Sequence, residues 1–244
     1  MQLAVIGHAQ PQSRLGVDAA DRRREIPETV RAFCFWAATA MAATYIVFIA
    51  GFVANGMSLL PVPWDQIVAV GASILLAPSF VLLLIGLHYF APETKRIWTH
   101  GAIAFGLLYA AFVSLVYVTL LFVVEPHVVN HTESEVAPFL FAKGSFTQML
   151  DGLGYTYMSL AVGLTFPIFF GSHLASWIRW IAILSLPSAF GVLIAYIAYS
   201  FPYELLGIGS FLVPLYGVLV AIYFRKPAGK GKYPASSPGG GSRG

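Results

Sequence analysis

The residues best suited to metal chemistry lie in a polar stretch near the middle of the chain. His127, His131 and Glu135 follow one another at intervals of four residues, which would place them on one face if a helix began at Pro126. Two imidazoles and a carboxylate can hold Zn²⁺ or Fe²⁺, so these residues are a candidate metal site. The alternative is a solvated acidic loop followed by an amphipathic interfacial segment, because the two intervening valines disfavour a helix and the H-E-x-x-H pattern is absent.

Three other histidines form a second candidate set. His88, His100 and His173 each fall near the predicted cytoplasmic end of an apolar stretch, so their rings could meet and hold a metal. Haem ligands normally lie deeper in a helix bundle, which argues against haem at these positions. The alternative is that the three histidines are interfacial and bond to lipid headgroups or water.

Most other signatures of chemistry are missing from the sequence. It contains no nucleophile elbow, P-loop or dinucleotide-binding fingerprint, and the single Cys34 excludes an internal disulfide or a cysteine-based metal cluster. No Asp, Glu, Lys or Arg is predicted at mid-membrane, which argues against a retinal Schiff base, a proton-coupled pump and a voltage sensor. We therefore favour a non-enzymatic protein, although the histidines leave enzymatic activity open.

The composition determines which elements must position these residues. Of 244 residues, 58% are hydrophobic and only 10% are charged, whereas soluble domains carry roughly 25% charged residues. Charges separate six apolar runs, each long enough for a helix to cross a bilayer. The sequence therefore predicts an all-α bundle of six transmembrane helices. The expected spans are about 32–54, 67–90, 100–123, 152–171, 178–199 and 204–224.

The basic residues predict the orientation of these spans. Thirteen of the fourteen Lys and Arg residues fall on the side that holds both termini, and only Lys143 falls on the other. Cytoplasmic loops retain positive charge, so both termini are expected in the cytoplasm. We divide the chain into a cytoplasmic tail (1–30), a transmembrane domain (31–225) and a disordered cytoplasmic tail (226–244) that ends in GGGSRG.

Prolines and one aspartate stand out within or beside the spans. Prolines 78, 167, 187 and 214 fall inside predicted spans, where they can kink helices as in transporters, although prolines are common in membrane helices. Asp151 is expected to cap the outer end of the fourth helix, where its charge would complement the helix dipole. All acidic residues are expected outside the hydrocarbon.

One segment resembles a known type of protein. The stretch GSFTQMLDGLGY, residues 144–155, leads into Met158-Ser-Leu-Ala and then the turn Trp177-Ile-Arg179-Trp180. This pattern resembles uncharacterised bacterial six-span integral membrane proteins, mainly over the C-terminal half. The resemblance implies a six-helix fold in a bacterial inner membrane and carries no functional motif.

These observations leave three hypotheses about function. The first is a non-enzymatic accessory or scaffold subunit of a membrane complex, or a binder of a hydrophobic ligand. The second is a carrier for a small neutral or lipidic solute, and the third is a metal or redox protein that uses the histidines. Expected partners are membrane lipids, other membrane subunits or a second copy of the chain. Nucleic acid is not expected, because the net charge of +3 is spread over helix ends.

Overall fold

The computed structural model describes residues 27–61, 63–198 and 212–225. Both predicted tails, apart from residues 27–30, and the first eight residues of the sixth predicted span lie outside these described ranges. Within them every regular element is a helix and there is no strand, in agreement with the predicted all-α class.

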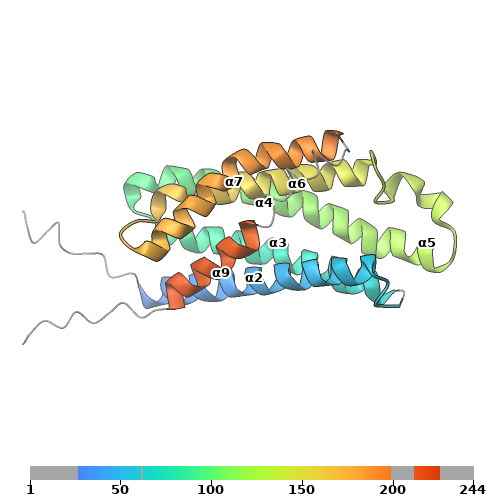
Figure 1. The fold of residues 1–244 in the computed structure, drawn as a ribbon, viewed down its shortest axis with the longest axis horizontal. Helices are drawn as coiled ribbons and strands as arrows, with labels where there is room; N and C mark the ends of the chain where they lie inside the picture. Colours follow the sequence, from blue (N-terminus) through green and yellow to red (C-terminus); the bar gives the residue numbers. More distant parts are fainter. Residues whose placement is uncertain (1–26, 62, 199–211, 226–244) are drawn as a thin grey trace, which may run out of the picture. The chain divides into compact units, whose positions relative to one another are not determined.

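Four helices are long and apolar enough to cross a membrane (Figure 1), and they cover the first, second, third and fifth predicted spans. They are α2 (Glu28–Gly56), α3 (Trp64–Phe90), the continuous helix from η1 (Glu93–Lys95) through α4 (Arg96–Thr119), η2 (Leu120–Val124) and α5 (Glu125–Val129), and α7 (His173–Ala198). Two shorter helices, α6 (Phe146–Gly163) and α9 (Leu212–Arg225), complete the bundle. Two 3-10 turns, η3 (Glu133–Phe139) and η4 (Phe166–Ile168), lie on either side of α6 along the chain.

The bounds predicted for the fourth span were wrong. The helix starts at Phe146 because Ser145 is its N-cap, and the Ser145 hydroxyl accepts a hydrogen bond from the Gln148 N–H at 3.1 Å. It ends at Gly163, and the chain then turns through η4, where Pro167 lacks an N–H for a continuing helix. The helix therefore begins six residues earlier than expected and stops eight residues sooner.

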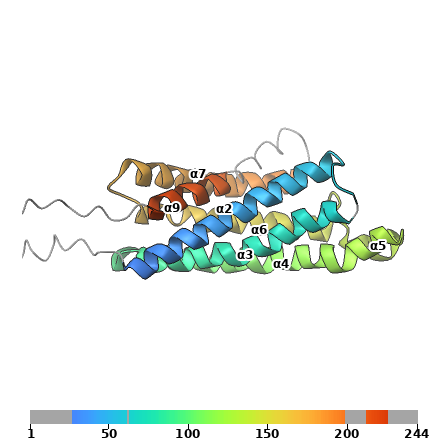
Figure 2. The same ribbon diagram turned by 90° about the horizontal axis from the view of Figure 1, so that it is seen from below.

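The six longer helical segments form a closed ring (Figures 1 and 2). Each packs against the next along the chain, in the order α2, α3, α4, α6, α7 and α9, and α9 returns to pack against α2. Small residues meet where the ring closes, and a Cβ added at Gly217 of α9 would make ordinary van der Waals contact, at 3.4 Å, with the Ala42 Cβ of α2. Tyr216 of α9 also reaches the α6–α7 connection, with 2.7 Å between its hydroxyl oxygen and that of Thr165.

Many large apolar side chains are exposed on the outer surface of the bundle. Examples are Trp36, Leu75, Ile97 and Phe190, which are 67%, 61%, 74% and 64% exposed, respectively. A soluble protein rarely exposes so much continuous apolar surface, whereas lipid tails solvate it well. The described bundle therefore has the surface of an integral membrane protein.

The two ends of the bundle differ in character. The end where α2 begins and α9 ends has a small surface depression lined by Glu28, Arg31 and Arg225. The Lys95 ammonium group, in the α3–α4 connection, donates a 2.6 Å hydrogen bond to the Pro167 carbonyl and lies 4.3 Å from the centre of the Phe170 ring. One lysine thus ties two neighbouring connections together at the basic end. The opposite end contains a cavity of about 730 Å³.

Candidate functional site

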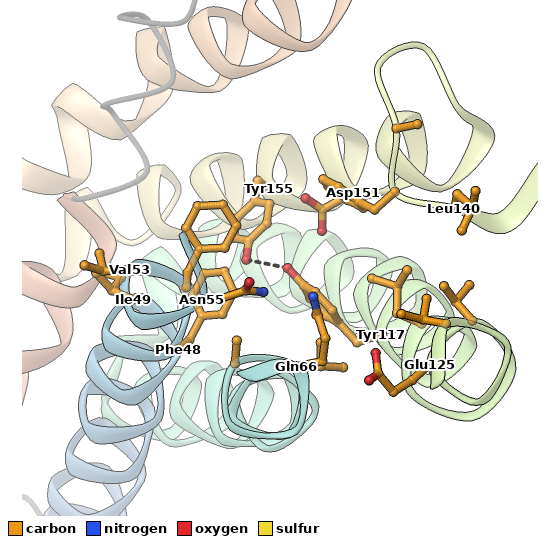
Figure 3. Close-up of a pocket in the computed structure, with 18 of the residues that line it drawn as sticks. Phe48, Ile49, Val53, Asn55, Gln66, Tyr117, Glu125, Leu140, Asp151 and Tyr155 are labelled. Atoms are coloured by element: carbon orange, nitrogen blue, oxygen red, sulfur yellow. Dashed lines mark hydrogen bonds between the residues drawn. The ribbon is translucent and has the colours of Figure 1, made fainter. Parts of the chain in front are cut away.

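A pocket of about 730 Å³ opens at the end of the bundle opposite the basic connections (Figure 3). It is lined by α2, α3, α4, η2, α5, the loop after η3, α6 and α7. This volume falls within the roughly 300–1,000 Å³ of typical small-molecule sites. Most of the lining is apolar, and a few polar side chains converge on the space. Such a combination is typical of a ligand site.

The most unusual group in this pocket is the carboxylate of Asp151 on α6. The side chain lines the pocket although the residue is only 2% exposed. Its Oδ2 accepts a 2.7 Å hydrogen bond from the Tyr196 hydroxyl of α7, while its Oδ1 has no hydrogen-bond partner in the described part of the chain. A buried charge without full compensation is costly, so this carboxylate has capacity for a further partner.

The predicted role of Asp151 as a helix cap was therefore wrong. Ser145 caps α6, and Asp151 lies more than one turn further along the helix, where it faces the interior. Gly152 makes room for the residue that holds Asp151, because a Cβ there would lie 2.5 Å from Cγ of the Tyr196 ring. The glycine next to the aspartate thus allows the aromatic hydroxyl to reach the carboxylate.

Tyrosines from four helices surround Asp151. The hydroxyl oxygens of Tyr117 and Tyr155 lie 3.1 Å apart, and Figure 3 shows them close to the Asp151 carboxylate. The Tyr155 ring stacks on Phe48 with centroids 6.5 Å apart, and Tyr45 meets Phe48 edge-on at 5.9 Å. These rings join α2, α4 and α6 into a rigid aromatic wall around a small polar centre.

A second acidic side chain, Glu125, enters the pocket because the helix changes its winding. Residues Leu120–Val124 form a π-helical turn between α4 and α5. Glu125 follows Tyr117 by eight positions, which on a regular helix would place the two side chains about 80° apart around the helix axis. The extra residue of a π turn reduces this angle to about 20°, so both side chains line the pocket.

The carboxylates of Asp151 and Glu125 both lie inside the protein, with residue exposures of 2% and 7%. Burial inside the bundle does not fix the depth of these groups in a bilayer, so the expectation that all acidic residues lie outside the hydrocarbon stays a prediction. Figure 3 also shows the amide groups of Asn55 and Gln66 directed into the same space. Among the residues that the structure describes, no Lys, Arg or His lines the pocket. The site is thus acidic, aromatic and only partly polar.

The sequence contained an overlooked signal for this site. Four tyrosines, at positions 45, 117, 155 and 196, occupy the outer halves of their predicted spans. Because alternate helices run in opposite directions, such residues reach the same depth in a bundle. Their phenol groups need hydrogen-bond partners when buried, and the neighbouring Asp151 provides one.

The structure separates the members of the first histidine set. Helix α5 ends at Val129, and His131 adopts a left-handed backbone conformation with φ of 56°. The continuous helical face on which the metal hypothesis depended is therefore absent, since the helix does not extend to His131 or Glu135. The chain turns back, however, and brings His127 Nε2 to 3.9 Å from Glu135 Oε2.

The second histidine set is brought together in part. The rings of His88 and His100 lie 4.4 Å apart between centroids, and His88 Nδ1 is 2.8 Å from the Thr99 hydroxyl. His173, at the start of α7, packs instead against the Trp177 ring at 6.1 Å. Within the described ranges, no three His, Cys, Asp or Glu side chains form a group able to hold a metal ion. Zinc or iron binding at either set stays a prediction.

We compared the chain with protein families, curated proteins and solved structures. No family, curated protein or solved structure matches it. The site must therefore be interpreted from its own geometry.

Proposed function

We propose that this chain is a six-span integral membrane protein that binds an amphipathic small molecule or lipid in the pocket at its outer end. The pocket itself carries this proposal. It combines a ligand-sized volume of about 730 Å³ with a mostly apolar lining and a buried, incompletely bonded carboxylate. Natural binding sites use apolar surface for affinity and a few polar groups for orientation.

The mouth of the pocket favours a ligand that arrives from the lipid. Phe52 and Val53 of α2 line the pocket and are 65% and 51% exposed. Apolar side chains at this position offer a continuous path between the hydrocarbon phase and the polar centre near Asp151. An amphipathic ligand would leave its apolar part among these residues and direct its polar group inward.

In the proposed topology, α6 and α9 are the two further spans, both termini lie in the cytoplasm and the membrane is a bacterial inner membrane. The charge distribution supports it, because thirteen of fourteen basic residues fall on the side of the two termini. The pocket would then open toward the extracytoplasmic half of the bilayer.

Cysteine labelling tests this topology. In a Cys34→Ala background, Ser134→Cys should react with a membrane-impermeant maleimide in intact spheroplasts. Thr94→Cys, also exposed, should react only after the membrane is permeabilised. The opposite pattern, or equal labelling of both positions, would refute the proposed orientation.

Photolabelling tests ligand binding directly. The probe is decanol that carries a diazirine in its chain and a terminal alkyne, applied to the full chain in dodecylmaltoside and mapped by peptide mass spectrometry. We expect saturable labelling of peptides from the pocket lining, displaced by unlabelled decanol. Val53→Trp should block it by filling the mouth. Val47→Trp, on the same helix but outside the pocket lining, should not.

The same experiment defines the result that would reject ligand binding. Labelling that does not saturate, or that the two tryptophan variants change equally, would show partition into the micelle rather than occupation of the pocket. Thermal melting of each variant verifies that the bundle is folded in the detergent used.

A carrier activity is the second candidate function. Pro78 and Pro187 lie inside α3 and α7, two helices that line the pocket. Proline kinks are frequent in the moving helices of transporters. Uptake of decanol into vesicles does not test a carrier, because decanol crosses lipid unaided. A ligand with a permanently charged head group does not cross unaided, so its uptake into proteoliposomes that contain the protein, but not into protein-free liposomes, would demonstrate a carrier.

A further inference from the structure

We infer that the ligand of this pocket is an organic cation, a lipophilic ammonium compound whose positive head group binds beside Asp151. This inference rests on the proposed ligand-binding function and names the chemical class of the ligand. Three features of the described residues carry it: the charge of the lining, the unused carboxylate oxygen and the aromatic wall.

The charge of the lining excludes an anionic head group on electrostatic grounds. Two carboxylates, Asp151 and Glu125, line the pocket, and none of the described residues that line it is Lys, Arg or His. An anion placed among them would face like charges in a region of low dielectric, where Coulomb repulsion is strong. A cation in the same place would supply the compensation that buried carboxylates require.

The geometry at Asp151 provides the point of contact. Tyr196 holds Oδ2 with a 2.7 Å hydrogen bond, which fixes the orientation of the carboxylate. Oδ1 is buried, lacks a hydrogen-bond partner in the described ranges and belongs to a residue that lines the cavity. An ammonium group has donors but no acceptors, which matches this arrangement. A neutral hydroxyl would satisfy Oδ1 without neutralising the carboxylate.

Aromatic rings complete the match to a cation. Seven of the twenty lining residues are Tyr or Phe, and cations bind favourably over the faces of such rings, with quaternary ammonium groups as the best-known ligands. The rest of the cavity, which includes Ile49, Val70, Leu120 and Val124, is suited to an alkyl or aryl tail. The apolar lining, the carboxylates and the aromatic rings of the pocket therefore all favour a lipophilic cation as the ligand.

The test uses three photoprobes that share one diazirine-containing ten-carbon chain. The first carries a trimethylammonium head, the second is the decanol probe with its hydroxyl head, and the third is the matching decanoate with a carboxylate head. Micellar partition differs between head groups, so half-saturation concentrations are compared between variants for each probe separately. In Asp151→Asn we expect the half-saturation concentration of the cationic probe to rise at least about tenfold, because one partner of a buried charge pair is lost. That of the neutral probe should change less than about threefold.

Two further variants separate charge from structure. Asp151→Glu keeps the negative charge and should retain labelling by the cationic probe. Glu133→Gln removes a carboxylate that does not line the pocket, so it should change labelling by neither the cationic nor the neutral probe. Unchanged labelling by the neutral probe in Asp151→Asn would show that the pocket remains intact.

Each possible outcome decides one proposal. In one outcome, the cationic and the neutral probe both give saturable labelling that Val53→Trp blocks and Asp151→Asn leaves unchanged. This result would refute the cationic ligand and would still support a ligand site in the pocket. An equal loss of both probes in Asp151→Asn would also overturn it, since Asp151 would then hold the pocket together rather than select charge. Preferential pocket labelling by the matching decanoate probe would overturn it as well. Absence of labelling sensitive to Val53→Trp with every head group would reject the proposed function itself.

Discussion

The contact between α2 and α3 predicts opposite effects for two identical substitutions. A Cβ added at Gly51 of α2 would lie 2.9 Å from both Cα and N of Ala69 on α3. These are backbone atoms, so no side-chain rotation can relieve the overlap. The helices would have to separate by about half an ångström to reach the 3.4 Å of ordinary contact. Overpacking of this kind costs about 1–3 kcal/mol.

Gly71, in the interior of α3, is the matched control. A Cβ at this position meets no atom within 4 Å. Replacement of a helical glycine by alanine contributes about 0.5–1 kcal/mol of stability, because it restricts the unfolded backbone. The same gain applies to Gly51→Ala, so the difference between the two variants isolates the helix contact. We expect Gly71→Ala to be more stable than Gly51→Ala by about 1–3 kcal/mol.

Reversible unfolding in mixed dodecylmaltoside and SDS micelles, followed by circular dichroism, measures this difference. The two glycines lie in adjacent helices, and both substitutions add a single methyl group. If the two alanine variants unfold at the same SDS fraction, α2 and α3 do not come as close at Gly51 and Ala69 as described.

Three other predictions concern single side chains. Ser145→Ala should cost about 1 kcal/mol by removing the α6 cap, and hydrogen exchange should show earlier exchange of the Gln148 amide. Tyr196→Phe should destabilise the protein by about 1.5–3 kcal/mol, since it removes the hydrogen bond to a buried carboxylate. In the Asp151→Asn background the same substitution should cost much less, and a double-mutant cycle measures this coupling. Cys34, which is 0% exposed, should resist a membrane-permeant maleimide until SDS unfolds the bundle, as mass spectrometry can follow.

Matched substitutions show what would contradict these expectations. Ser79→Ala removes a hydroxyl that bonds only within its own helix at an exposed site and should leave exchange at Gln148 unchanged. Tyr157→Phe changes a ring that packs against Phe105 and Phe112 and should cost less than Tyr196→Phe. Equal losses in the two tyrosine variants, or rapid labelling of Cys34 in the native protein, would show that the described interior is wrong.

The sequence by itself determined the class of the protein and most of its helices. Low charge and long apolar runs predict helices because lipid offers no hydrogen-bond partners to an open backbone, and this argument needs no tertiary information. Four observed helices cover the first, second, third and fifth predicted spans, and they extend beyond the predicted bounds by up to seven residues at one end. The prediction failed at the fourth, because the helix starts at the Ser145 cap and stops before Pro167, two local effects that an apolar run does not reveal.

Only the tertiary structure decided what faces the interior. Hydropathy places Asp151 near the end of a span, but it cannot tell whether the side chain meets water or a cluster of tyrosines from three other helices. That outcome depends on the ring of helices, on the space left at Gly152 for Tyr196 and on the π turn that directs Glu125 inward. Partners distant in the chain make a buried charge tolerable, and their meeting is a property of packing. The sequence supplied the carboxylates and phenols, and the fold made them one site.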